Sequence, residues 1–464
     1  MEANDMNDNR RKRNLQKEMR YSMYWDFFTV TVVALAISIL SPDIPVVGSR
    51  NIIFLGVMFA AITGAFMVAF EKYLPGAEDL WEKNVISILS ALLTWVLLIG
   101  VNLVFFFSKA LAVLLSIMAL VCMVALIVVN VLLVSYYNSK KFRKARLLII
   151  ATEDRNFVRM KRIKYGVTGV YDTWYEQVKG DISTFADEMF PKFDAVCILD
   201  GISDADYNIA VKKAMLMNKE IFVVPKIIDI GKCKAQLVRL DDILTMYIPE
   251  HSLNRVERAL KRLIDIAMSG AGLIVAAIPM LLIAVAIKLT SPGPVFYKQV
   301  RCTRGKKEFE IYKFRTMVPD AEKLSGPTFA QKDDPRITKV GKLLRACRLD
   351  ELPQLINIFR GDMSVVGPRP ERPFFVEQFE DEIENYDYRF RVKAGLTALS
   401  HVYGRYSTDI HDRTCYDLYY IANYSLLLDI KIILLTAKTM FQKSAAEGVE
   451  EYNTPKEVVA NEKE

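Results

Sequence analysis

Residues that bind metals or carry acid–base chemistry are scarce in this chain. Its 464 residues include 3 histidines and 6 cysteines, and no two cysteines form a C-x-x-C pair. Five of the cysteines fall in segments that we place in the reducing cytosol. We therefore expect free thiols and no structural zinc site.

Two further absences limit the possible functions. The apolar run at residues 147–151 continues into Thr-Glu-Asp-Arg-Asn, and not into the G-x-G-x-x-G turn that lets a backbone approach a pyrophosphate. Dinucleotide binding is therefore not expected there. The first long apolar run follows a basic tail and has no small-residue cleavage site, so we predict an anchor and not a cleavable signal peptide.

Long apolar runs, by contrast, are abundant. Hydrophobic residues make up 52% of the chain, charged residues make up 25%, and the mean hydropathy is +0.18, so the apolar residues must be unevenly distributed. Runs at 24–40, 52–70, 85–107 and 110–135 are each close to the ~20 residues that a membrane-spanning helix needs. We predict four transmembrane helices. Aromatic rings that favour the headgroup layer lie at their edges: Tyr24, Trp25, Trp81, Tyr136 and Tyr137.

Basic residues determine the predicted orientation, because cytoplasmic flanks are rich in lysine and arginine. The loop at 41–51 has only Arg50, and the loop between the third and fourth helices has only Lys109. Both ends of the bundle should therefore be cytoplasmic. The basic flanks comprise Arg10, Arg11, Lys12, Arg13, Lys17 and Arg20 before the first helix, and Lys140, Lys141, Arg143, Lys144 and Arg146 after the fourth.

A soluble α/β pattern follows the fourth helix. Short apolar runs at 147–151, 195–199 and 221–225 alternate with helical stretches, which predicts parallel strands with crossover helices in a Rossmann-like unit. Because the glycine turn is missing, we interpret this unit as a scaffold, regulatory or dimerisation domain. A retained nucleotide site is the alternative.

A fifth apolar run, at 263–289, is long enough to span the membrane, but both of its flanks are basic. Pro279 lies inside the run, where it removes a helical hydrogen bond and clashes with the preceding turn. A helix that enters the membrane, breaks and returns satisfies both observations. The flanking basic residues are Arg255, Arg258, Lys261 and Arg262 on one side and Lys298, Arg301, Arg304, Lys306 and Lys307 on the other.

Beyond this run, alternation around residues 304–307 predicts a β-hairpin with a basic turn. Residues 337–359 combine apolar and basic positions in a helical pattern. We interpret them as an amphipathic helix at the membrane interface, and an ordinary core-facing helix is the alternative. Pro353 should bend this helix just past Asp350 and Glu351.

Asp350 and Glu351 form an acidic pair in a basic setting. Arginines can hold a polyanionic substrate by charge-assisted hydrogen bonds, while a carboxylate among them can attack phosphorus or bind a divalent metal. A solvated helix turn with local ion pairs remains the alternative for an isolated Asp-Glu pair. The surrounding arginines are Arg345, Arg348, Arg360 and Arg369.

These surroundings resemble the bacterial sugar transferases, the monotopic phosphoglycosyl transferases that load a polyprenyl phosphate with a sugar 1-phosphate. The resemblance runs from about residue 258 to 443, and the front half is similar to the long members that start capsule, exopolysaccharide or O-antigen synthesis. The segments that carry it are GPVFYKQVR (293–301), FEIYKFRTM (309–317), DDPRITKVGKLLRACRLDELPQL (333–355), GDMSVVGPRP (361–370) and RVKAGLT (391–397).

The resemblance implies a covalent mechanism. Asp350 would attack the sugar-bearing phosphorus of a UDP-sugar, release UMP and form a sugar-phosphoryl-aspartate, which undecaprenyl phosphate then attacks. Mg²⁺ would bridge the diphosphate, with Asp350 and Glu351 as ligands. Glu351 could instead orient the nucleophile, and the sequence leaves both roles open.

Further substrate contacts are expected from basic and polar residues on both sides of the acidic pair. Arg369, between two prolines, is the best candidate for a rigid phosphate clamp, although it could cap a turn instead. For the others, a solvated face or structural ion pairing is the alternative. This set comprises Lys313, Arg315, Arg348, Arg391, Lys393, Asp412, Arg413 and Asp417.

The chain departs from the family pattern at a few positions. Ile278 precedes Pro279 where the family typically has serine, and Ala394-Gly395 stands in place of Pro-Gly. His401 occupies a position where the family commonly has glutamine, so a general-base role is not expected. The alternative functions are a membrane-anchored nucleotide-sugar oxidoreductase or dehydratase, and a non-catalytic assembly subunit.

The predicted architecture is a membrane protein of α plus α/β class in the bacterial inner membrane, with its catalytic domain in the cytoplasm. Expected partners are a UDP-sugar, undecaprenyl phosphate, the bilayer and a second copy of the chain, but no nucleic acid. Glucose or galactose is favoured as the sugar. The predicted segments are a basic tail (1–20), four transmembrane helices (21–137), the Rossmann-like domain (138–253), a linker with the re-entrant helix (254–290), the catalytic domain (291–444) and an acidic disordered tail (445–464).

Overall fold

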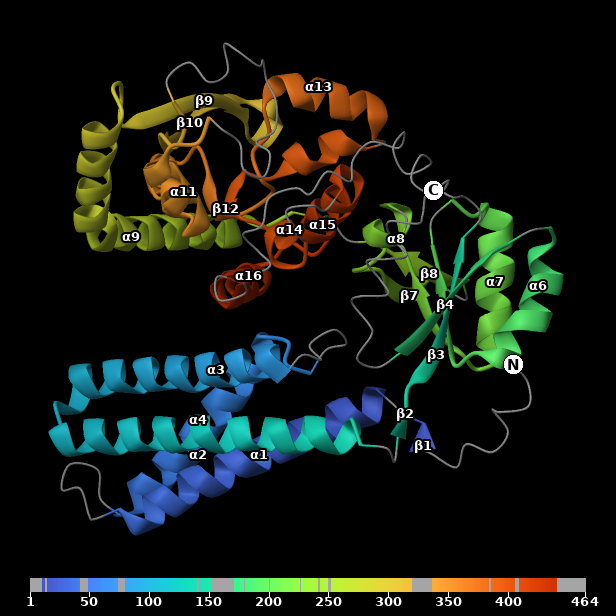
Figure 1. The fold of residues 1–464 in the computed structure, drawn as a ribbon, viewed down its shortest axis with the longest axis horizontal. Coiled ribbons are helices and arrows are strands. Elements are labelled where there is room, and N and C mark those ends of the chain that lie inside the picture. Colours follow the sequence, from blue (N-terminus) through green and yellow to red (C-terminus); the bar gives the residue numbers. More distant parts are fainter. Residues whose placement is uncertain are drawn as a thin grey trace. The chain divides into compact units, whose positions relative to one another are not determined.

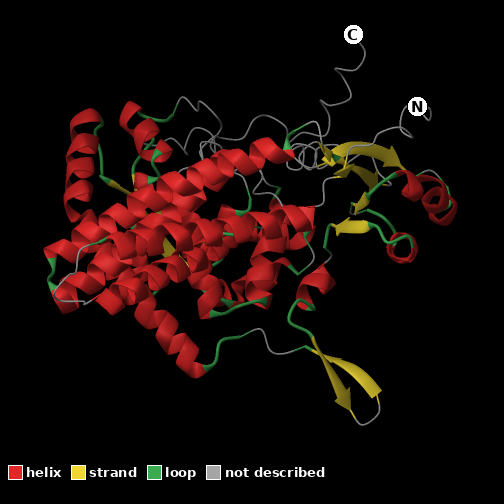
Figure 2. Ribbon diagram, turned by 90° about the horizontal axis from the view of Figure 1, so that it is seen from below, coloured by secondary structure: helices red, strands yellow, loops and turns green. Residues whose placement is uncertain are grey.

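The computed structural model divides into two compact units, Met1–Lys226 and Ile227–Glu464 (Figure 1). Helices predominate, and strands are short and few (Figure 2). The predicted acidic tail at 445–464 and much of the predicted basic tail lie outside the described residues. The structure describes residues 11–12, 15–41, 49–73, 80–139, 142–151, 171–178, 180–199, 201–225, 227–240, 243–248, 252–318, 336–383, 385–404 and 409–439.

All four predicted helices of the bundle are present in the first unit. The bundle core is apolar, but large apolar side chains also point outward, including Phe54 (63% exposed) and Leu132 (63% exposed). Such a surface suits lipid, since lipid-facing side chains need no aqueous partner. By length and composition, α1, α4 and α3 together with η1 can cross a membrane, and α2 is a shorter apolar helix. The elements are α1 (Leu15–Leu40), α2 (Ser49–Ala69), α3 (Leu80–Val101), the π-helical turn η1 (Asn102–Phe106) and α4 (Lys109–Tyr137).

A buried ion pair lies inside this bundle. The Nζ of Lys72 is 2.8 Å from Oδ2 of Asp26, and both side chains are 0% exposed. Lys72 also donates to Ser87, and the hydroxyl of Tyr73 donates to Asp26. Each charged group thus has a partner, as burial in an apolar bundle requires.

A four-stranded parallel sheet follows, in the order β4-β3-β5-β6. The three predicted strands are confirmed, and β4 is an additional edge strand whose polar and aromatic sequence gave no apolar run. The first four strands of a flavodoxin-type doubly wound sheet have this order, while the Rossmann-like assignment remains a prediction. The elements are β3 (Ala145–Ala151), β4 (Tyr171–Gln177), α6 (Ile182–Met189), η3 (Phe190–Lys192), β5 (Ala195–Ile198), α7 (Asp204–Leu216) and β6 (Glu220–Val223), with β1 (Arg11–Lys12) paired to β2 (Phe142–Arg143).

The second unit begins with α8 (Ile227–Gly231), which packs on α15 (Ile410–Ala422). Ile230 shares a buried cluster with Leu418 and Ala422. The antiparallel hairpin of β7 (Gln236–Leu240) and β8 (Ile243–Tyr247) then leads to α9.

Helix α9 (Arg255–Thr290) contains 36 residues, begins at a capping box formed by Asn254 and Glu257, and includes Pro279. Figure 1 shows it as two straight segments that meet at a sharp bend, which is the effect expected of an internal proline. Its first half contacts α12 (Gln354–Arg360), and Ile287 near its end is buried against Phe314 and Leu344. A straight helix of this length would extend about 54 Å, so the bend lets both halves contact the same domain.

The rest of the second unit surrounds a core that includes Ile311, Ile358, Val366 and Ile432. The predicted hairpin is confirmed, with its turn at Gly305, where φ is +69°. The elements are β9 (Phe296–Cys302), η4 (Arg304–Lys306), β10 (Glu308–Phe314), α11 (Lys339–Ala346), η5 (Leu349–Glu351), α12, β11 (Ser364–Val366), α13 (Pro373–Glu382), η6 (Tyr386–Arg391), β12 (Gly395–Thr397, parallel to β11), α14 (Leu399–Val402), α15 and α16 (Leu426–Thr439).

Candidate active site

Asp350 and Glu351 lie on the short 3₁₀ turn η5, between helices α11 and α12. Helix α11 ends before them because Arg348 adopts a left-handed conformation with φ of +54°. Helix α12 begins after them at Pro353, which acts as its N-cap. The single amphipathic helix predicted over 337–359 is therefore two helices, and the acidic pair occupies the break between them.

Glu351 joins the two principal cations of the site. Its Oε1 accepts from Nζ of Lys313 at 3.1 Å and from Nη2 of Arg369 at 3.0 Å. Burial acts to raise the pKa of this carboxyl, but Lys313 and Arg369 outweigh it and hold the pKa well below its usual value. Burial also lowers the pKa of Lys313, against the attraction of Glu351. Glu351 is thus an ionised counterion with two fixed partners.

Asp350 is in a different state. Burial and the neighbouring charge of Glu351 raise its pKa, and Lys313, Arg345 and Arg369 offset this only in part. Among the described residues, no hydrogen bond or ion pair holds the Asp350 carboxylate. The pair therefore consists of one fully engaged carboxylate and one more basic carboxylate without a protein partner in the described structure.

Arg369 is held at both its side chain and its backbone. Besides Glu351, its guanidinium contacts Nε2 of His401, 3.1 Å from Nη1. Its carbonyl oxygen accepts from Nη2 of Arg389 at 2.8 Å, and Arg389 forms a buried ion pair with Asp417 at 2.8 Å. Asp417, predicted as a substrate contact, is thus linked through Arg389 to the backbone of Arg369. Burial raises its pKa to about 6, although Arg389 opposes this.

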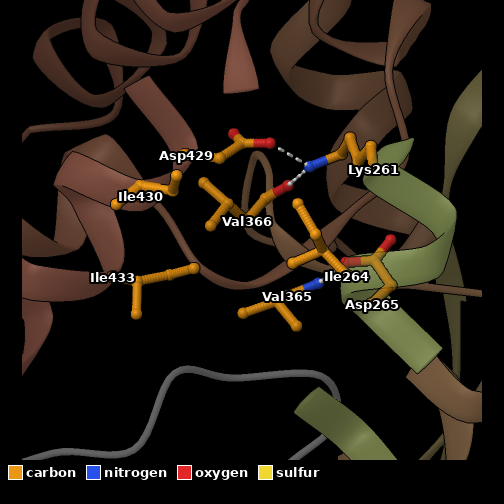
Figure 3. Close-up of a pocket in the computed structure, with 8 residues that line it drawn as sticks. All are labelled: Lys261, Ile264, Asp265, Val365, Val366, Asp429, Ile430 and Ile433. Atoms are coloured by element: carbon orange, nitrogen blue, oxygen red, sulfur yellow. Dashed lines mark hydrogen bonds and ion pairs between the residues drawn. The ribbon is translucent and has the colours of Figure 1, made fainter. Parts of the chain in front are cut away.

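The strand that leads into Arg369 is held by the first half of α9. Nζ of Lys261 donates to the carbonyl of Val366 at 3.1 Å and to Oδ2 of Asp429 at 2.6 Å, as Figure 3 shows. Asp265, one helical turn further on, accepts from the backbone amide of Val365 at 2.9 Å and lies beside the same strand (Figure 3). These bonds satisfy the edge of β11 that β12 does not pair, and so they fix the position from which Arg369 extends.

A side chain also holds the free edge of β10, the strand that carries Lys313. The buried side chain of Asn357 accepts from the amide of Tyr312 at 3.0 Å and donates to the carbonyl of Glu310 at 2.7 Å. A side-chain amide thus pairs with the free edge of β10 as a neighbouring strand would. This contact fixes Lys313 next to Glu351.

Several predicted substrate residues have partners within the protein. Arg315 is buried and donates to the carbonyls of Ser291 and Pro292. Lys393 donates to the carbonyl of Gly361 at 2.7 Å, at the end of α12. Arg391 stacks on the ring of Tyr388 at 4.6 Å. Their roles toward substrate remain predictions.

The other predicted residues lie near the clamp or on its supporting helix. Arg348 and Arg413 are close enough to His401 to lower the pKa of its imidazole. Burial raises the pKa of Tyr416, and the charge of Asp412 on α15 raises it further. The chain therefore brings Asp350, Glu351, Lys313 and Arg369 together, with Arg348 and Arg413 as further positive charge.

The donor set fits a magnesium ion that arrives with its substrate. Within the described part of the chain, no three His, Cys, Asp or Glu side chains gather as a preformed metal site. Mg²⁺ commonly binds through one or two carboxylates together with substrate phosphates and water. Asp350, which no described protein cation directly pairs, suits that role better than Glu351.

Sequence reasoning missed four residues that shape this site: His401, Arg389, Asn357 and Lys261. Each acts through contacts between segments distant in the chain, and no spacing pattern indicates such contacts. The prolines around Arg369 were the usable signal, because they mark a rigid segment.

The fold and site define a membrane-anchored protein in which an acidic pair, two fixed cations and further arginines form a site suited to phosphate chemistry. Comparison with known families agrees. Residues 256–443 match the family model described as bacterial sugar transferase, and the chain is 40% identical to an exopolysaccharide production protein of Rhizobium leguminosarum over 189 residues, which are 39% of this chain and 94% of that protein. The chain belongs to the bacterial sugar transferase family.

Two longer relatives are matched over part of their length. A UDP-N-acetylgalactosamine-undecaprenyl-phosphate N-acetylgalactosaminephosphotransferase of Aeromonas hydrophila is 47% identical over 164 residues, which are 35% of this chain and 38% of that protein. A UDP-glucose:undecaprenyl-phosphate glucose-1-phosphate transferase of Escherichia coli is 37% identical over 232 residues, which are 49% of this chain and 50% of that protein. The matched region thus spans half or less of these two relatives.

Proposed function

We propose that the chain transfers a hexose 1-phosphate from a UDP-sugar to undecaprenyl phosphate, giving undecaprenyl-diphosphate-sugar and UMP. The observation that carries this proposal is the unequal acidic pair, in which Glu351 is bound by Lys313 and Arg369 while Asp350 is not paired directly with either cation. A more basic carboxylate is the better nucleophile, and the adjacent cations can hold the phosphate that it attacks.

The chemistry proceeds in two displacements at one phosphorus. A carboxylate oxygen of Asp350 forms a bond to the sugar-bearing β-phosphorus, and the bond to the bridging oxygen breaks, so that UMP leaves with the electron pair. An oxygen of the lipid phosphate then attacks the same phosphorus and releases Asp350. The lipid phosphate is already ionised and needs no general base. We therefore expect no such role for His401.

The surrounding residues divide the remaining work. Arg369 and Lys313 neutralise the charge that would otherwise keep two anionic substrates apart. Glu351 holds both cations in place between turnovers. Magnesium, when bound with the diphosphate at Asp350, would offset the negative charge on the departing UMP.

We further propose that α9 enters the cytoplasmic leaflet of the inner membrane and returns to the same side. Its bend, its basic flanks and the contacts of both halves with one domain support this topology. The exposed apolar residues Ile274 (79%) and Val275 (78%) would lie in lipid. The site would then face the cytosol, where nucleotide-activated sugars are found.

We expect a role in the first membrane step of exopolysaccharide, capsule or O-antigen synthesis, and the name of the exopolysaccharide production protein supports the first of these. Because the named relatives differ in their sugar, the sugar used by this chain is left to experiment, with glucose or galactose as our expectation. We also expect a homodimer supported by the α/β domain.

The test is incubation of the purified full-length protein with radiolabelled UDP-sugar, undecaprenyl phosphate and Mg²⁺. The proposal predicts lipid-linked sugar together with an equal amount of UMP. A modified nucleotide sugar would instead indicate an oxidoreductase or dehydratase. No product with any UDP-hexose, from a folded and membrane-inserted protein, would indicate a non-catalytic subunit.

A further inference from the structure

The side chain of His401 contacts the clamp and not the reacting carboxylate. His401 lies on α14, and its Nε2 is 3.1 Å from Nη1 of Arg369. A guanidinium carries only donors, so the imidazole nitrogen must accept this hydrogen bond. The geometry therefore places the ring proton of His401 on Nδ1 and leaves the imidazole neutral.

The charges around His401 favour the same state. Burial lowers the pKa of the imidazole most, and Arg369, Arg348 and Arg413 lower it further, while Glu351 acts to raise it. The result is a pKa of about 3. At neutral pH the ring is therefore not an imidazolium that could act as a general acid, and its acceptor nitrogen is already engaged by Arg369.

The guanidinium of Arg369 is thus fixed at two points. Nη2 donates to Oε1 of Glu351 at 3.0 Å and Nη1 donates to His401 at 3.1 Å. Because a guanidinium is planar, two contacts through different nitrogens define the orientation of its plane. The direction of the whole guanidinium is thereby set, at a side chain that is 38% exposed.

We propose that His401 is a positioning residue whose neutral imidazole fixes the plane of the Arg369 guanidinium for binding the diphosphate of the nucleotide sugar. This inference rests on the proposed function, because it names a group that orients the clamp in that reaction. It assigns His401 no proton transfer and no bond to substrate. The required chemical property is a hydrogen-bond acceptor at this position, and not a titratable group.

Two substitutions separate an acceptor from a base in the full-length protein. His401→Gln retains an acceptor oxygen near the position of Nε2, whereas His401→Leu retains bulk but no acceptor. His411→Leu is the matched control. His411 is the next histidine in the chain, and its ring contacts Cys415. The readouts are kcat and KM for UDP-sugar, the pH profile, the thermal midpoint, and the Kd of UDP measured without turnover.

We expect His401→Leu to lower kcat/KM by about 10- to 100-fold, the range for one hydrogen bond to a charged group, mainly through KM and with a matching rise in the Kd of UDP. His401→Gln should recover most of this loss and keep the pH profile of the wild type, and His411→Leu should resemble the wild type. A folded His401→Leu with wild-type kinetics would overturn the inference. A folded His401→Gln that is as impaired as His401→Leu, or one that loses a limb of the pH profile, would also overturn it.

If the proposed function itself is wrong, the results will differ from those that overturn the role of His401. In that case the wild type itself would neither form lipid-linked sugar nor bind UDP, and the role of His401 would fall with it. If the wild type is active, the comparison of the three variants decides the role of His401 alone.

Discussion

Asp350 and Glu351 are neighbours in the chain, yet their surroundings give them opposite electrostatic properties. Glu351 accepts from both Lys313 and Arg369, and its pKa is lowered, whereas burial raises the pKa of Asp350. Environments that shift two adjacent carboxylates in opposite directions allow them to perform different tasks. In the proposed reaction, Glu351 organises the cations and Asp350 attacks phosphorus.

The first prediction concerns Glu351. Glu351→Gln removes the anion that Lys313 and Arg369 share, so both cations should lose their fixed position, and kcat/KM should fall by about 100-fold. Residual activity should remain, because Asp350 is intact. Steady-state assay of UMP release checks this, with the folded state verified by thermal unfolding. Wild-type kinetics for Glu351→Gln would show that the counterion role is wrong.

The second prediction concerns the stability contribution of His401 as a function of pH. Its folded-state pKa of about 3 lies below the ordinary value of 6.5, so the unfolded chain binds more protons between these values, and stability is lost as pH falls from 6.5 toward 3. Between pH 7.5 and pH 5 this residue alone should cost about 2 kcal/mol.

His401→Gln has no such titration, so its free energy of unfolding should fall less than that of the wild type over the same pH range. Reversible thermal unfolding in detergent at both pH values measures the difference. Identical pH dependence in the two proteins would mean that His401 is not buried in the neutral form.

The sequence singled out Asp350, Glu351 and Arg369 as an acidic pair among arginines, and Lys313 as a basic strand position next to Arg315, while the family resemblance supplied the expected role of Asp350. The sequence did not identify His401 or Arg389. A lone buried histidine, or an arginine that holds a backbone carbonyl, has no characteristic spacing and depends on how α14, α15 and η6 pack. Lys393 and Arg315 match basic family positions in sequence, but the structure gives both of them backbone carbonyls as partners.

At the scale of elements, the bend of α9 is the feature on which the proposed membrane topology depends. Pro279 and the basic flanks were readable in the sequence, and Figure 1 shows the resulting bend. The sequence predicted only one end of the break between α11 and α12. Pro353 indicated its second end, but the left-handed Arg348 at its first end is not a residue type that the sequence marks as a turn.

The third prediction concerns topology. If α9 returns to the side from which it enters, cysteines placed at Glu257 and Lys298 should both resist a membrane-impermeant thiol reagent in intact cells. The background protein must lack its own exposed thiols, Cys233 and Cys347. A cysteine in the loop at 41–51 serves as the externally labelled control. Labelling at position 298 but not at 257 would mean that α9 spans the membrane.

The fourth prediction concerns the contact between α9 and β11. Lys261→Met leaves Asp429 buried without its cation, so it should destabilise the second unit by about 3–5 kcal/mol. The double variant Lys261→Met/Asp429→Leu removes both charges and should be more stable than Lys261→Met alone. Thermal unfolding of the three proteins in the same detergent measures this, and a double variant less stable than the single one would contradict the account.

At the scale of the whole molecule, every group proposed to act in the reaction lies in the second unit. The predicted boundary at 254 would remove α8, yet Ile230 of α8 packs against Leu418 and Ala422, and Lys234 donates to the carbonyl of Tyr424 at 3.1 Å. The sequence placed these residues with the preceding domain because they continue the α/β pattern. Their contacts with α15 and its neighbourhood depend on tertiary packing, which the pattern does not contain.

The fifth prediction follows from this arrangement. A protein that begins at Ile227 should keep transferase activity close to that of the full chain, since it retains α8, α9 and all the proposed site residues. A protein that begins at Asn254 should also keep the chemistry but unfold at a lower temperature. Both should be less associated than the full chain in nanodiscs. Complete loss of activity in a folded, membrane-bound 227–464 protein would show that the first unit contributes to the active site.

The central claim is the covalent bond to Asp350, and direct trapping of the intermediate tests it. The full-length protein would be incubated with a UDP-sugar radiolabelled at the β-phosphate and Mg²⁺ but no lipid acceptor, then quenched, digested and mapped by mass spectrometry. We predict one sugar-phosphoryl group on Asp350, released when undecaprenyl phosphate is added, and neither label nor UMP from Asp350→Asn. Label on a different residue, or turnover by Asp350→Asn at a substantial fraction of the wild-type rate, would contradict the account.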